Sequence, residues 1–128
     1  AIGVAKALGA KLTAMHVVRK FHSVFESEGF LMLKTPDLKE HYEEETKAHA
    51  DKILQAVKKA AGEAGVQCFS AVVFGDLPYK AIIEEAEKAK CDVIMMASHG
   101  RRGLQGMLLG SETQQVLTHS KIPVLVLR

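Results

Sequence analysis

The chain has 128 residues, of which 48% are hydrophobic and 25% charged, and its formal net charge is +2. These values predict one globular domain over residues 1–128, large enough to bury a single core. Scattered basic residues favour no nucleic-acid partner, and no apolar run approaches the roughly 20 residues that a membrane-spanning helix needs.

Helical and strand patterns alternate along the chain, which indicates an α/β protein whose parallel strands are joined by crossover helices. The expected elements, in order, are a helix over 1–8 stopped by Gly9, a strand over 12–18, an irregular connection over 19–36, a helix over 38–64 stopped by Gly65, a strand over 66–74, a helix with Pro78 in its first turn, a strand over 91–97, a helix over 111–119 and a strand over 122–128. The strands lack clean apolar alternation, as expected when helices cover both faces of a sheet.

Side-chain patterns add detail to these elements. Asp76 is expected to cap the helix that carries Pro78. Cys68 and Cys91 each stand near the start of a strand and are expected to be small buried thiols rather than a disulfide, which suits the reducing cytoplasm. The long helix has small and apolar residues at three- and four-residue steps, which predicts its buried face: Thr46, Ala50, Ile53, Val57, Ala60 and Ala64.

The run over residues 96–111 carries the strongest functional signal. It contains a loop between a buried apolar strand that ends at Ala97 and a helix that opens at Ser111, and Gly100 and Gly110 stand at the two ends of this loop. Ser111 with Gln114 predicts a capping box at the start of the next helix. Glycines let the main chain approach a ligand closely, and the first turn of a helix offers unpaired N–H groups and the positive end of a dipole. The run therefore predicts a phosphate-binding loop.

Better-known catalytic and nucleotide-binding motifs are absent from this run. A P-loop has Lys and Ser or Thr directly after its last glycine, whereas Ser111 and Glu112 follow Gly110, and the dinucleotide fingerprint G-x-G-x-x-G is missing. Ser98 and His99 are adjacent at a strand end, where neighbouring side chains point apart, so we interpret them as turn residues. No catalytic residue and no metal ligand is assigned.

The spacing of the glycines carries a family resemblance. Nine residues separate Gly100 from Gly110, and Ser111 follows directly. This pattern resembles the nucleotide-binding signature of the universal stress protein family, G-x-x-G-x9-G-S/T, with Ala97 in place of the first glycine. Further motifs extend the resemblance over nearly the whole chain: Leu12 to Val18, Gly75-Asp76-Leu77-Pro78, Ser98-His99-Gly100 and Ile122 to Leu127.

The resemblance implies a three-layer α/β/α fold with an open parallel sheet of strand order 3-2-1-4-5, like that of the adenine nucleotide alpha-hydrolases. Family members begin with a strand that carries an Asp, whereas this sequence opens inside the first helix at Ala1. That strand would lie between the strands over 12–18 and 93–97, whose inner edges would otherwise lack partners. We therefore expect an upstream strand in the intact protein.

The resemblance also implies a bound adenine nucleotide, ATP or AMP, with or without Mg²⁺. The resemblance implies that the backbone of Val17 lies against adenine and that Ala97 and Gly100 lie near the ribose and phosphate. These contacts would come from the carboxyl ends of two strands, where open α/β sheets bind their ligands.

The phosphates would be bound at the far end of the loop. The resemblance implies that Gly110, Ser111 and Glu112 donate main-chain N–H groups to them. For Arg101 the chemistry leaves two interpretations, because its guanidinium would either neutralise phosphate or keep the loop soluble.

The function predicted from these features is that of a small cytoplasmic stress-response protein that binds a nucleotide and regulates partners. A slow ATP hydrolase or phosphotransfer enzyme is the alternative, with Ser111 and Glu112 as the nearby candidates, and a dimerisation module without nucleotide is another. The apolar run over 122–128 is a short edge strand, and the resemblance implies that it pairs with its copy in a homodimer.

Overall fold

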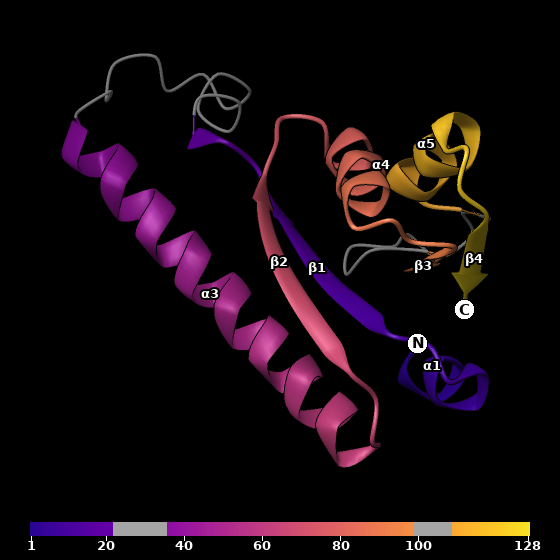
Figure 1. Cartoon of the computed structure of the whole chain (residues 1–128). Coiled ribbons are helices and arrows are strands. Elements are labelled where there is room, and N and C mark those ends of the chain that lie inside the picture. Colours follow the sequence, from indigo (N-terminus) through magenta and orange to yellow (C-terminus); the bar gives the residue numbers. More distant parts are fainter. Residues whose placement is uncertain (22–35, 99–108) are drawn as a thin grey trace. The chain divides into compact units, whose positions relative to one another are not determined.

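The computed structural model describes residues 1–21, 36–98 and 109–128 (Figure 1). In chain order the elements are α1 (Ile2–Leu8), β1 (Leu12–Val18), α3 (Pro36–Glu63), β2 (Cys68–Phe74), α4 (Pro78–Lys88), β3 (Ile94–Ala97), α5 (Ser111–His119) and β4 (Val124–Leu127). They form two compact units, Ala1–Asp76 and Leu77–Arg128.

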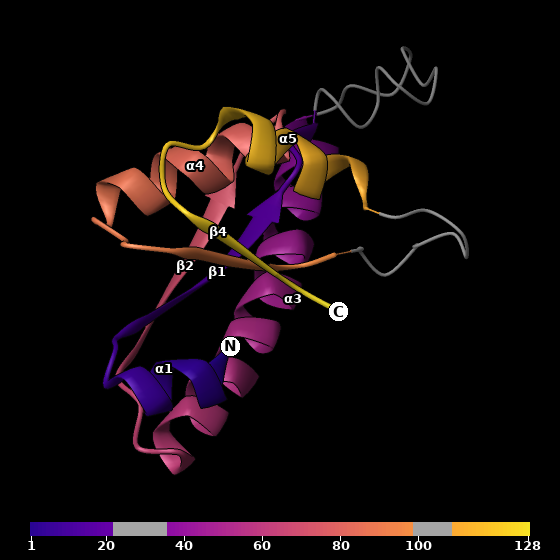
Figure 2. The same ribbon diagram turned by 90° about the vertical axis from the view of Figure 1, so that its right-hand side faces the viewer.

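The first unit is built on a parallel pair of strands. β1 and β2 pair over seven residues, from Leu12 opposite Cys68 to Val18 opposite Phe74. The 28-residue helix α3 packs on both strands and runs along their length (Figures 1 and 2). Its buried residues are Ala50, Leu54 and Ala61. Of these only Ala50 was predicted, so the buried face has the helical spacing but lies on partly different residues. Ala60 was expected on that face and is exposed instead.

The end of α3 joins the helix to the core of this unit. Gly65 has φ +75°, the left-handed conformation that glycine adopts without a steric penalty. The N–H of Gly65 donates to the Gly62 carbonyl at 3.0 Å and the N–H of Val66 donates to the Ala61 carbonyl at 2.8 Å. This pair of bonds is a Schellman motif, which ends a helix by satisfying its last carbonyls. Ala61 and Val66 are buried together with Ala5 of α1.

The second unit is also built on a parallel pair. β3 and β4 pair over four residues, from Ile94 opposite Val124 to Ala97 opposite Leu127. Helices α4 and α5 pack against each other, and Ala86, Ile94 and Val116 form the centre of the core. Val116 has no exposed surface.

The α/β class and the parallel strands are confirmed, and the pairing follows the expected strand order. The described strands form two separate two-stranded sheets, β1–β2 and β3–β4. In the order 3-2-1-4-5 these are the pairs on either side of the first strand. Within the described ranges neither β1 nor β3 has a second strand partner. The strand expected between them stays a prediction.

Two strand boundaries differ from the predicted ones for a common reason. β2 begins at Cys68 rather than residue 66, and β3 at Ile94 rather than residue 91. The N–H of Val66 donates to Ala61 at the end of α3, and the N–H of Cys91 donates to Ala86 at the end of α4. An apolar residue that follows a helix can therefore belong to the helix end. β4 is also shorter than predicted, and both cysteines are half-buried free thiols.

Candidate functional site

The base of the glycine-containing loop is closed by main-chain hydrogen bonds. Ser98, directly after β3, donates its N–H to the Leu127 carbonyl at 2.7 Å, which extends the pairing with β4 by one residue. The Ser98 carbonyl accepts the N–H of Gly110, also at 2.7 Å. The chain that leaves β3 at Ser98 thus returns to the same point before α5 begins. Gly100 and Arg101 lie in the intervening segment, outside the described residues.

Thr113 fastens the first turn of α5 to the end of β3. Its hydroxyl donates to the Ala97 carbonyl at 3.0 Å and lies 3.4 Å from the Ser98 carbonyl. Thr113 itself is only 3% exposed, and its bond to Ala97 is partly buried. Sequence reasoning missed this residue, although its position three residues before the buried Val116 places it on the inner face of the helix.

The first turn of α5 presents unengaged main-chain donors. Gly110 is the N-cap, with φ −68° and ψ 152°, and no side chain caps the helix. The first bond of the helix runs from the Gln114 N–H to the Gly110 carbonyl at 3.0 Å. In the part of the chain that the structure describes, the N–H groups of Ser111, Glu112 and Thr113 therefore have no acceptor. Three donors at the positive end of a helix suit an anion.

Two expectations about this turn are corrected. The predicted capping box is wrong, because Ser111 is the first helical residue and its side chain makes no cap bond. Gly110 was expected to give its N–H to phosphate, but in this structure that N–H donates to Ser98. The Gly110 N–H is used in this way because it joins the two ends of the loop at Ser98. Gly110 still provides a site without a side chain beside the free donors.

Glu112 uses its carboxylate within the protein. Oε2 accepts the N–H of Tyr79, the second residue of α4, at 3.0 Å. Helix α4 needs this acceptor because its N-cap, Leu77, has no side-chain cap bond. The expectation that Asp76 caps α4 is wrong, since its carboxylate instead lies 3.7 Å from Lys20 Nζ.

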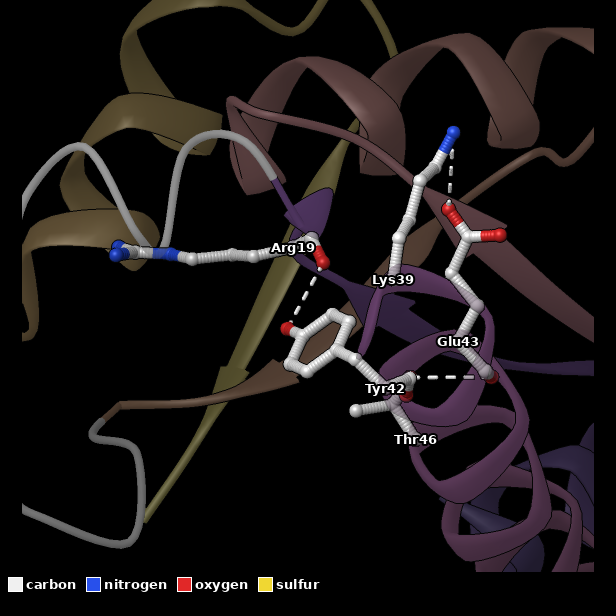
Figure 3. Close-up of polar contacts among 5 residues, drawn as sticks. All are labelled: Arg19, Lys39, Tyr42, Glu43 and Thr46. Atoms are coloured by element: carbon white, nitrogen blue, oxygen red, sulfur yellow. Dashed lines mark hydrogen bonds and ion pairs between the residues drawn. The ribbon is translucent and has the colours of Figure 1, made fainter. Parts of the chain in front are cut away.

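Val17 lies in the other unit, one residue before the end of β1, opposite Val73. The chain beyond it is tied to α3, as Figure 3 shows: the Tyr42 hydroxyl donates to the Arg19 carbonyl at 3.1 Å. Burial raises the pKa of the Tyr42 phenol above its ordinary value, and the positive charge of Arg19 opposes part of this rise. Thr46 donates its hydroxyl to the Tyr42 carbonyl at 2.6 Å and so fixes the turn of α3 that carries the tyrosine.

The structure therefore brings four of the seven predicted residues together at one junction: Ala97, Gly110, Ser111 and Glu112. Across residues 1–21, 36–98 and 109–128, no group of three His, Cys, Asp or Glu side chains is arranged to hold a metal ion. No helix in these ranges combines the length and apolar composition needed to cross a bilayer.

Comparison with known proteins gives consistent matches. The model of the universal stress protein family matches residues 1–128. Universal stress protein MJ0531 of Methanocaldococcus jannaschii is 34% identical over 128 residues, which cover 100% of this chain and 71% of that protein. The solved structure of MJ0577, a protein of the same organism, is similar with a TM-score of 0.79 and 25% identity over 98% of this chain and 83% of that one. A universal stress protein solved in complex with cAMP has a TM-score of 0.64 and 24% identity, covering 99% of this chain and 80% of that one.

Proposed function

Because the chain belongs to the universal stress protein family, we propose that it binds an adenine nucleotide, ATP or AMP, and acts as a regulatory binding module. The phosphates contact the main-chain N–H groups of Ser111 and Glu112, joined by that of Thr113. Ala97 and Gly100 lie near the ribose and phosphate, Arg101 neutralises phosphate, and the Val17 backbone lies against adenine. Mg²⁺ accompanies the nucleotide when ATP is bound.

The single observation that carries this proposal is the set of three N–H groups without acceptors in the first turn of α5, beside the carboxyl end of β3. A helix start offers both donors and partial positive charge to a phosphate. Thr113 and the closed loop base hold these donors in place, so an anion meets a preformed site. A structural relative solved in complex with cAMP, itself an adenine nucleotide, supports this choice of ligand.

Thermal unfolding with and without nucleotide tests the proposal. ATP or AMP at about a hundred times its dissociation constant should add roughly 2.7 kcal/mol to the free energy of unfolding and raise the Tm. Inorganic phosphate at the same concentration is the control for ionic strength. Mass spectrometry of ligand released from protein purified without added nucleotide identifies the bound species. An unchanged Tm with ATP, ADP and AMP would instead favour a dimerisation module that binds no nucleotide.

Gly110→Val tests the site itself. Since Gly110 has φ −68° and ψ 152°, which any residue can adopt, the branched side chain adds bulk without backbone strain. We expect at least a tenfold loss of ATP affinity with a small change in stability. Gly110→Ala adds only one methyl group and should lose less. Equal affinity in all three proteins would mean that nucleotide does not approach α5.

The hydrolase alternative needs a carboxylate that orients the attacking water. Glu112 is the nearest carboxylate in sequence, and its oxygen accepts the Tyr79 N–H rather than being free to orient water. We therefore propose binding without turnover. Release of ADP from ATP at a rate above that of a heat-denatured sample would contradict this.

We further propose a cytoplasmic homodimer that forms through β4. Leu125, in the middle of this strand, is 40% exposed, and an uncovered apolar edge strand favours pairing with a copy of itself. The half-buried free thiols of Cys68 and Cys91 suit a reducing compartment. Leu125→Lys should convert the dimer to a monomer in sedimentation, and a monomeric wild-type protein at micromolar concentration would exclude the dimer.

A further inference from the structure

Glu112 holds together the starts of two helices. Its backbone lies in the first turn of α5, and its carboxylate accepts the N–H of Tyr79 in the first turn of α4 at 3.0 Å. The bond is partly buried. A carboxylate near a helix N-terminus is favoured by the dipole, so the same charge serves the positive ends of both helices.

Tyr79 is contacted by α5 at a second point. Its ring lies against the ring of His119, with centroids 5.1 Å apart and planes tilted by 38°. The His119 ring is itself held at the end of α5, because its Nδ1 lies 2.9 Å from the Gln115 carbonyl oxygen. Glu112 and His119 are about two helical turns apart. Contacts at both ends therefore fix the position of α5 along α4.

The first turn of α5 is thus held on two sides. The Thr113 hydroxyl attaches it to β3, and the Glu112 carboxylate attaches it to α4. The three N–H groups without acceptors belong to this same turn. A carboxylate there would repel an incoming phosphate if it faced the ligand, but its bond to Tyr79 directs it toward α4.

We propose that Glu112 is a positioning residue for phosphate binding. Its carboxylate keeps the first turn of α5 where the N–H groups of Ser111, Glu112 and Thr113 converge on a phosphate, and it contacts no ligand atom. This inference rests on the proposed function, and it assigns to the side chain a role separate from that of the main chain.

The test compares Glu112→Ala with Glu112→Gln. Both remove the same negative charge, but the glutamine side-chain oxygen can still accept the Tyr79 N–H. ATP affinity is measured by calorimetry at a temperature where urea titrations show each protein to be fully folded. We expect Glu112→Ala to weaken ATP binding about tenfold, and Glu112→Gln to restore it to within about twofold of wild type. Glu87→Ala removes an exposed charge from α4 and serves as the matched control.

The outcomes separate this inference from the function on which it rests. Wild-type protein that binds no ATP overturns the proposed function and this inference with it. ATP binding by the wild type together with equal affinities for Glu112→Ala and Glu112→Gln overturns the positioning role alone. A loss of stability in Glu112→Ala with unchanged ATP affinity would also overturn it, because the bond would then serve only the fold.

Discussion

The two units secure their parallel strand pairs in different ways. In the first unit, β1 and β2 pair over seven residues and a 28-residue helix lies along them. In the second, β3 and β4 pair over only four residues, and single polar bonds hold the chain beyond the strands. Those bonds are the Ser98 N–H to Leu127, the Gly110 N–H to Ser98 and the Thr113 hydroxyl to Ala97.

The first unit is therefore determined mainly by a periodic apolar pattern, and the junction in the second unit mainly by individual polar residues. A long helix on a long strand pair distributes its stabilisation over many contacts, so no single polar group determines its position. A short strand pair with a polar junction depends instead on a few individual hydrogen bonds. The proposed phosphate donors lie in the second kind of region, in the first turn of α5.

The first prediction has the largest expected change in the free energy of unfolding, and it asks whether the two units unfold together. Leu54 is 5% exposed in the first unit, and Leu54→Ala should lower the free energy of unfolding by about 2–5 kcal/mol. Val116 is fully buried in the second unit, and Val116→Ala should lower it by about 1.5–3 kcal/mol. Because we expect residues 1–128 to form one domain, both substitutions should shift one common transition.

The chain offers a direct measurement of this, because it has no tryptophan and only two tyrosines, Tyr42 and Tyr79. Tyr42 belongs to the first unit and Tyr79 to the second. Tyrosine fluorescence of Tyr79→Phe therefore reports on the first unit, and that of Tyr42→Phe on the second. In each variant we expect the tyrosine fluorescence and the circular dichroism to change at the same urea concentration. Different midpoints for the two signals would show that the units unfold as two independent domains.

The second prediction concerns the polar junction. Thr113→Val keeps the shape of the side chain but removes the hydroxyl that donates to the Ala97 carbonyl. We expect a loss of about 1–3 kcal/mol, because Thr113 is buried and the Ala97 carbonyl loses a partner. Thr118→Val is the matched control: its hydroxyl bonds to Gln114 in the same helix and is exposed, so its effect should stay within about 0.5 kcal/mol. Equal losses of unfolding free energy for Thr113→Val and Thr118→Val in urea denaturation would mean that the bond to Ala97 adds no more stability than an exposed bond within the helix.

The sequence predicted well where elements depend on periodicity and poorly where they depend on individual hydrogen bonds. The bounds of β1 and α5 agree with the prediction, although the capping box that placed the start of α5 is wrong. The partner of the Gly110 N–H was not predictable, because Ser98 meets it only in the folded chain. The same holds for Thr113 and for the Glu112 carboxylate, whose partners are 16 and 33 residues away.

The third prediction compares helix ends in the two units. The Schellman motif of α3 has Gly65 at φ +75°, whereas the same motif at the end of α4 has Lys90 at φ 53°. A side chain in the left-handed region is strained, so Lys90→Gly should raise the free energy of unfolding by about 0.5–1 kcal/mol. Gly65→Ala should lower it by about 1 kcal/mol, although no atom lies within 4 Å of the added methyl group.

A within-helix control separates conformation from composition. Gly62 lies inside α3 with nothing within 4 Å, so Gly62→Ala should add about 0.5–1 kcal/mol to the free energy of unfolding. The opposite signs at Gly62 and Gly65 depend only on the backbone angle. A loss of stability in Lys90→Gly would mean that the left-handed turn carries no strain.

The smallest expected effect concerns the bond that ties the end of β1 to α3. Tyr42→Phe removes the hydroxyl that donates to the Arg19 carbonyl but keeps the ring against Phe21, 5.6 Å away between centroids. At pH 8 we expect the free energy of unfolding to fall by about 0.5–1 kcal/mol relative to wild type.

The same bond gives the stability a pH dependence. Since burial raises the pKa of Tyr42 above 10.0, the folded protein holds the phenol proton more tightly than the unfolded chain does. The contribution of the phenol is therefore complete below pH 10 and is lost as the pH rises through the raised pKa. Urea titrations of both proteins should show their stability difference shrinking between pH 8 and pH 10.5, and a constant difference would mean that the phenol titrates alike in both states.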